Sequence, residues 1–202
     1  MGNVQKDRNS RAYEIVVSAA GIAVWLIAVA TILADAGWQE QLIILAMVPV
    51  IVTVGMFLQH FRLPLGLKFT RDRITFTLAD ACILLVACWL GLAPAVFLAG
   101  IEGFTSSRRT VRRLQANLFS SGMMSMGAAA ASLTLHIVLR YAFGEHTGTS
   151  LDHSLFATAV AMLAASMVQI AVNIALLSTL FMLRNNNRAL DVLKGYLETR
   201  LT

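Results

Sequence analysis

The chain has 202 residues, of which 57% are hydrophobic and only 13% charged, whereas a soluble domain carries about 25% charged residues. This composition excludes an ordinary soluble fold, and a chain this short with several membrane spans leaves no room for a separate soluble domain. The net charge of +5 sits in groups between apolar runs, a pattern typical of membrane orientation rather than of nucleic-acid binding.

Six apolar segments follow one another along the chain. Runs of about 20 apolar residues predict transmembrane helices. The segments cover residues 13–34, 41–61, 75–90, 93–106, 114–141 and 154–183. We therefore expect an all-α fold, a polytopic membrane helical bundle formed by residues 1–184. A cytoplasmic amphipathic tail over residues 185–202 is expected to follow it.

The third and fourth segments form a tight pair around a turn bracketed by Gly91 and Pro94. Each arm has about 14–16 residues, or about 21–24 Å of helix, which is less than the hydrocarbon core of about 30 Å. The pair is either a full hairpin in a thinned or tilted setting or a re-entrant hairpin. Both arrangements return the chain to the same side of the membrane.

Basic residues gather on one side of this arrangement. Fifteen of the sixteen Lys and Arg residues precede the first segment, follow the sixth, or lie in the second-to-third and fourth-to-fifth loops, and Arg140 is the exception. Asp35 and Glu40 lie in the first loop on the opposite side. The positive-inside rule then predicts two cytoplasmic termini and a multi-pass protein of a bacterial inner membrane.

Five polar residues interrupt the later segments. Asp80 and Glu102 lie at nearly the same depth in the third and fourth segments, and Asn117, Gln169 and Asn173 belong to the fifth and sixth. A charge at membrane depth costs about 2.5–3.5 kcal/mol, so these side chains should face the bundle interior. We expect Asp80 and Glu102 to approach each other, with at least one protonated or paired with Asn117 or Asn173.

Two interpretations of this polar group remain open. In the first, it forms a pocket that binds a small ligand or a cation. In the second, its members hydrogen-bond between helices and hold the bundle together. Asp80 is also placed to pair with Arg73 or to cap the start of its own helix.

Two surfaces are expected to make external contacts. An Arg-rich loop meets anionic lipid headgroups or acts only as an orientation signal. Its residues are Arg108, Arg109, Arg112 and Arg113. The tail places four leucines on one helical face, and its polar faces carry both charge signs, which favours a protein partner or a second copy over the membrane surface. These leucines are Leu190, Leu193, Leu197 and Leu201.

Catalysis and cofactor binding are not expected. Cys82 and Cys88 match no metal-site spacing, and His60 and His136 lie near opposite membrane edges, where they cannot share one haem iron. We therefore predict no catalytic residue, no metal and no cofactor. Trp25 is expected to pack inside the bundle, and small residues predict close helix contacts. These small residues are Ala95, Ala99, Gly100, Gly103, Gly127 and Ala131.

Three stretches carry a resemblance to known proteins, namely FTLADACILLVACWLGLAPAVFLAGIEGF, QANLF and VNIALLSTLFMLRNNNRALDVLKGYLETRLT. They resemble the membrane-embedded N-terminal region of bacterial signalling proteins with HD-type phosphohydrolase or diguanylate cyclase outputs. The first stretch also resembles vitamin-binding membrane subunits of bacterial importers, although Gly91-Leu92-Ala93-Pro94 replaces their direct Gly-Pro.

The resemblance implies a non-enzymatic sensory or anchoring module that couples to a cytoplasmic partner or output domain, and the chain is then a piece of a longer signalling protein or works with a partner. The alternatives are a small-molecule-binding transport subunit and an accessory subunit of a larger membrane complex.

The charge pattern makes a prediction about topology. A reporter enzyme that is active only in the periplasm should give no signal when it is fused after Thr202, because both termini are predicted to be cytoplasmic. The same reporter inserted between Asp35 and Glu40 should be active and serves as the positive control. Activity of the Thr202 fusion would contradict the predicted orientation.

Overall fold

The computed structural model describes residues 2–60, 78–142 and 155–185, and these are helical apart from short turns. Its helices are α1 Gly2–Asp35, α2 Trp38–His60, α3 Leu78–Trp89, α4 Leu92–Thr110, α5 Leu114–Ile137 with a π-helical continuation η1 Val138–Ala142, and α6 Leu155–Asn185. Each of the six expected segments corresponds to one helix, and the described ranges contain no strand. The tail leucines and the basic loop before α3 lie outside the described residues.

Four helical stretches are long and apolar enough to cross a membrane. They are Arg8–Asp35, Trp38–Gly55, Leu114–Ala142 and Leu155–Leu183. Large apolar side chains on their outer faces are exposed, among them Ile27 at 66% and Leu163 at 61%. Soluble monomers rarely expose continuous apolar surface of this kind. The chain is accordingly a helical membrane protein, with its apolar outer faces suited to lipid.

The α3–α4 hairpin occupies the interior of the bundle. The 12 residues of α3 give about 18 Å of helix, which is short of the about 30 Å core. The chain reverses at Gly91, whose φ of 93° lies in the left-handed region that glycine adopts without steric cost. Ile83, Ala95 and Ala99 are fully buried, whereas Leu85 is 56% exposed, so one face of the hairpin packs against the other helices.

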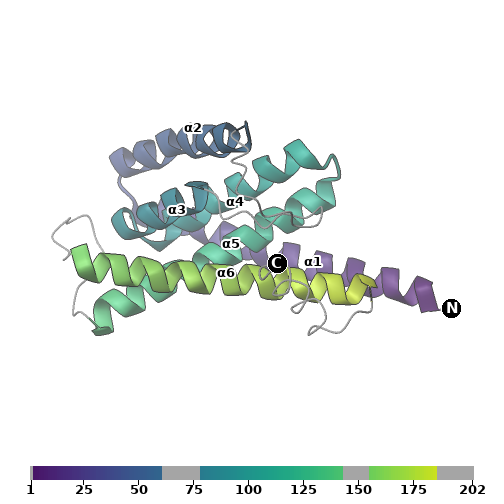
Figure 1. Ribbon diagram of the computed structural model, residues 1–202. Helices are drawn as coiled ribbons and strands as arrows, with labels where there is room; N and C mark the ends of the chain where they lie inside the picture. Colours follow the sequence, from purple (N-terminus) through teal and green to yellow (C-terminus); the bar gives the residue numbers. More distant parts are fainter. Residues whose placement is uncertain (1, 61–77, 143–154, 186–202) are drawn as a thin grey trace.

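Helix α5 is the centre of the bundle, because it packs against α1, α3, α4 and α6. Helix α2 lies outside α3 and α4 and contacts both (Figure 1). The start of α1, the α4–α5 turn and the end of α6 lie at the same, right-hand end of the bundle in Figure 1. The basic residues described at this end include Arg8 and Arg11 of the start of α1 and, at the α4–α5 turn, Arg108, Arg109, Arg112 and Arg113.

Helices α1 and α5 cross at two glycines. A β-carbon at Gly21 would overlap the backbone of Gly122, and a β-carbon at Gly122 would lie 3.0 Å from the carbonyl oxygen of Val17. Such close backbone approach strengthens packing between membrane helices, where the hydrophobic effect contributes little.

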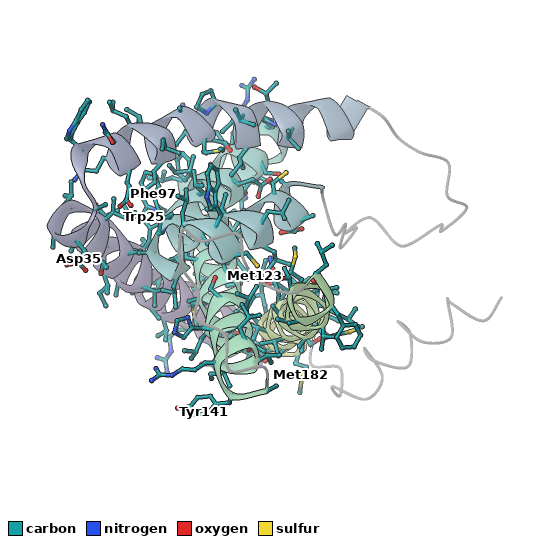
Figure 2. All side chains as sticks on the ribbon, turned by 90° about the vertical axis from the view of Figure 1, so that its left-hand side faces the viewer. Trp25, Asp35, Phe97, Met123, Tyr141 and Met182 are labelled. Carbon is teal, nitrogen blue, oxygen red and sulfur yellow. The ribbon has the colours of Figure 1, made fainter. Side chains whose placement is uncertain are left out.

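Helix α4 is packed through its own small residues. The Trp25 ring of α1 covers Gly100, donates a hydrogen bond from its indole nitrogen to the Phe97 carbonyl at 3.0 Å and stacks on the Phe97 ring (Figure 2). A β-carbon at Gly103 would meet the Met124 side chain of α5 at 2.8 Å. Trp25 is therefore a packing residue, as its central position in the first segment predicts.

Helices α5 and α6 meet along two rows with four-residue spacing. One row is Ala131, Leu135 and Leu139, and the other is Ala157, Ala161 and Ala165. All six side chains are buried. Ridges of residues four apart are the commonest way in which two helices interlock, and the alanines let α6 come close to α5.

The close approach of α1 and α5 at Gly21 predicts that a substitution at this position destabilises the protein far more than one at a neighbouring exposed position of α1. Gly21→Ala should lower the free energy of unfolding by about 2–3 kcal/mol or more, because the added methyl group meets rigid backbone. Ala20→Leu is the matched control, since Ala20 is exposed on the same helix. Unfolding of the purified protein in mild detergent measures both, and equal midpoints for the two variants would contradict the tight crossing.

Candidate functional site

Four of the five polar residues predicted from the sequence are packed into the bundle. The exposed fraction is 6% for Asp80, 5% for Glu102, 3% for Asn117 and 1% for Gln169. Asp80 belongs to the first turn of α3, where the positive end of the helix dipole stabilises a carboxylate. The alternative partner Arg73 lies outside the described residues.

A buried hydrogen bond joins the hairpin to the last helix. The Gln169 amide nitrogen of α6 donates to Asp80 Oδ1 of α3 at 3.1 Å. A bond to an ionised carboxylate is about twice as strong as one between neutral groups, and burial removes competing water. The polar link therefore fixes α6 against the start of α3.

Glu102 lies at the junction of α4 and α2. A β-carbon on Gly55 of α2 would be 3.3 Å from Glu102 Oε1, so the glycine makes room for the carboxyl group. Asp80 and Arg109 are both close enough to Glu102 to interact with it electrostatically. Arg109 also donates from Nη2 to the Val52 carbonyl of α2 at 3.4 Å. Asp80 and Glu102 therefore interact across the α3–α4 hairpin, and Arg109 connects the end of α4 to α2.

Asn117 belongs to a different cluster. Its Oδ1 accepts a hydrogen bond from Ser107 Oγ at 2.9 Å, which ties the start of α5 to the end of α4. It also lines a groove of about 440 Å³ together with Phe104, Arg108, Arg112 and Leu114. The polar residues expected to form one pocket are therefore divided between two places. These are the pair Asp80 and Glu102, here called the acid pair, and the turn between α4 and α5, here called the Arg-rich turn.

The Arg-rich turn carries all four arginines expected to meet lipid headgroups. Arg108, Arg109, Arg112 and Arg113 are exposed. The groove beside them combines two guanidinium groups with apolar side chains of Phe104 and Leu114, a combination suited to a phosphate group that carries a hydrocarbon chain.

Two carboxamide oxygens are buried without a hydrogen-bond donor among the described residues. They are Gln169 Oε1 and Asn173 Oδ1, and the latter approaches Gly127 of α5, where a β-carbon would be 2.8 Å away. Both residues continue the four-residue row of α6 alanines. Buried polar atoms normally have partners, so this face is where a cation or a small polar ligand would gain the most.

Comparison with known proteins identifies no relative from which a function could be inferred. No protein-family model, no curated protein and no solved structure matches the chain. Within the described ranges no three His, Cys, Asp or Glu side chains come together as metal ligands.

The Asp80–Gln169 bond predicts a measurable coupling in stability. Gln169→Leu should cost about 1–3 kcal/mol, because it removes a donor from a buried carboxyl group. The double variant Asp80→Leu/Gln169→Leu should be less destabilised than the sum of the single variants. Ser166→Ala is the control, since Ser166 bonds only to the Met162 carbonyl of its own helix. Additive effects in unfolding experiments would exclude the coupling.

Proposed function

We propose that the chain is a non-enzymatic sensory and anchoring module of a bacterial inner membrane. It couples the state of the buried Asp80–Glu102 pair to a cytoplasmic partner or output domain. The observation that supports this proposal is the hydrogen bond from Gln169 to Asp80, because it connects the enclosed hairpin to α6, the helix that precedes the tail.

The acid pair supplies the input of this module. A change in the protonation or cation occupancy of either carboxyl group alters its attraction for the Gln169 amide and for Arg109. The response can reach α6 through Gln169 and α2 through Arg109, since each makes a direct contact with a neighbouring helix. Sub-ångström changes of this kind move packed helices between discrete arrangements.

The basic end of the bundle supplies the output in this proposal. The Arg-rich turn lies there with the end of α6, and anionic headgroups would hold it at the cytoplasmic surface. The tail leucines Leu190, Leu193, Leu197 and Leu201 are the proposed contact for a protein partner or a second copy, because a short isolated helix is marginal in water.

A small-molecule-binding transport subunit is the second candidate. The unpartnered oxygens of Gln169 and Asn173 favour it, since a bound cation or ligand would satisfy them. In that case the acid pair would bind cargo, and its loss would leave the position of α6 unchanged.

The sensory proposal predicts that the acid pair controls the position of α6. In a variant with Cys82 and Cys88 replaced by Ala, spin labels at Arg108→Cys and Met182→Cys report the distance between the ends of α4 and α6. Asp80→Asn and Gln169→Leu should each shift or broaden this distance by about 2 Å, the size of helix shifts in switching proteins.

Ser166→Ala, one turn from Gln169, should leave the distance distribution unchanged. If Asp80→Asn and Gln169→Leu also leave it unchanged, the sensory proposal fails, and the buried bond either holds the bundle together or belongs to a binding site.

A further inference from the structure

A second cavity lies at the opposite end of α4 from the Arg-rich turn. It has a volume of about 540 Å³ and lies between α1, α2 and the α3–α4 turn. Its wall is apolar and includes Val24, Ala28, Ile32, Ile44, Pro94 and Val96. This volume is in the range of small-molecule and lipid sites, which are concave and mostly apolar.

The cavity opens towards the lipid rather than towards water alone. Helices α1 and α2 hardly pack against each other, and Ile27 at the cavity edge is 66% exposed. Along α1 the cavity extends from Val24 to Asp35, which is about 16 Å of helix. Half of a hydrocarbon core of about 30 Å is about 15 Å, so the cavity has the depth of one leaflet.

Two carboxylates stand at one end of this apolar wall. Asp35 and Glu40 line the cavity and are exposed, and neither side chain has an ion pair or hydrogen bond among the described residues. Figure 2 shows Asp35 at the outer edge of the bundle. An occupant that combines a hydrocarbon chain with a positive terminus would complement both the wall and the rim.

We propose that this cavity binds one acyl chain of a bilayer lipid whose headgroup ends in an ammonium group, with the ammonium between Asp35 and Glu40. A lipid with a purely anionic headgroup is disfavoured, because its phosphate would face two carboxylates without a compensating cation. A small polar solute is disfavoured by the apolar wall.

This site is distinct from the Arg-rich groove at the other end of α4, which is suited to anionic groups. In this proposal the acidic rim favours an ammonium group, whereas the Arg-rich groove favours an anionic group. The inference stands on the cavity and its rim alone and does not depend on the sensory function.

Retention of lipid during purification tests the proposal. The protein in mild detergent is mixed with equal amounts of phosphatidylethanolamine and phosphatidylglycerol of identical acyl chains, and native mass spectrometry counts the lipid bound per chain. Wild type should retain one phosphatidylethanolamine in preference to phosphatidylglycerol by about fivefold to tenfold, as expected for two exposed ion pairs.

Two sets of variants distinguish binding of the lipid acyl chain from recognition of the lipid headgroup. Ile27→Trp narrows the cavity mouth and should abolish retention, whereas Leu26→Trp, on the exposed neighbouring residue outside the cavity, should not. Asp35→Asn/Glu40→Gln should keep a bound lipid and lose the headgroup preference. Equal retention by Ile27→Trp and Leu26→Trp, or equal binding of both lipids by wild type, would overturn the proposal. Because all four positions are exposed, the variants should fold.

Discussion

Close approach of helix backbones to α5 is the constraint on which the rest of this bundle depends. Within a membrane the lipid is as apolar as the side chains, so helices associate through packing contacts and hydrogen bonds rather than through the hydrophobic effect. Gly122 admits α1, and the alanine row of α6 meets the row that begins at Ala131. Larger side chains at these positions would separate the helices and leave α3 and α4 without an enclosed interior.

This enclosure gives the polar residues their significance. Asp80 and Gln169 form a buried hydrogen bond because α6 lies close to the start of α3. Glu102 enters the α2–α4 contact beside Gly55, where a β-carbon would lie 3.3 Å from its Oε1. Removing one member of a buried hydrogen-bonded pair destabilises the fold by more than the bond contributes in net stability. The remaining partner stays buried and can bond neither to water nor to the protein. The same group is therefore suited to hold the bundle together and to change its packing when its charge changes.

The sequence predicts the helices well because long apolar runs and a turn bracketed by Gly91 and Pro94 are local signals. It also identifies the buried polar residues, since an acid within an apolar run has to face the interior. Which of these polar residues bond to each other is harder to predict, because it depends on how each helix is rotated about its own axis. Asn117 shares the depth of Asp80, yet it bonds to Ser107. The four-residue spacing of Gln169 from the α6 alanines indicates only that Gln169 lies on the buried face of α6. No local sequence pattern indicates the role of Gly55, because that role depends on where Glu102 lies in the folded bundle.

Helix α2 connects the two proposed sites. Its first half contributes Glu40 and Ile44 to the acidic-rimmed cavity, and its second half contributes Val52 and Gly55 to the contacts with Arg109 and Glu102. It packs on α3 and α4 but hardly on α1, so it is the helix with the least resistance to displacement. A lipid chain between α1 and α2 would set the angle at which α2 meets α4, and thereby the space available to the Glu102 carboxyl group. Under both proposals, lipid binding at one end would be coupled to the acid pair in the interior through α2, without any direct contact between the two sites.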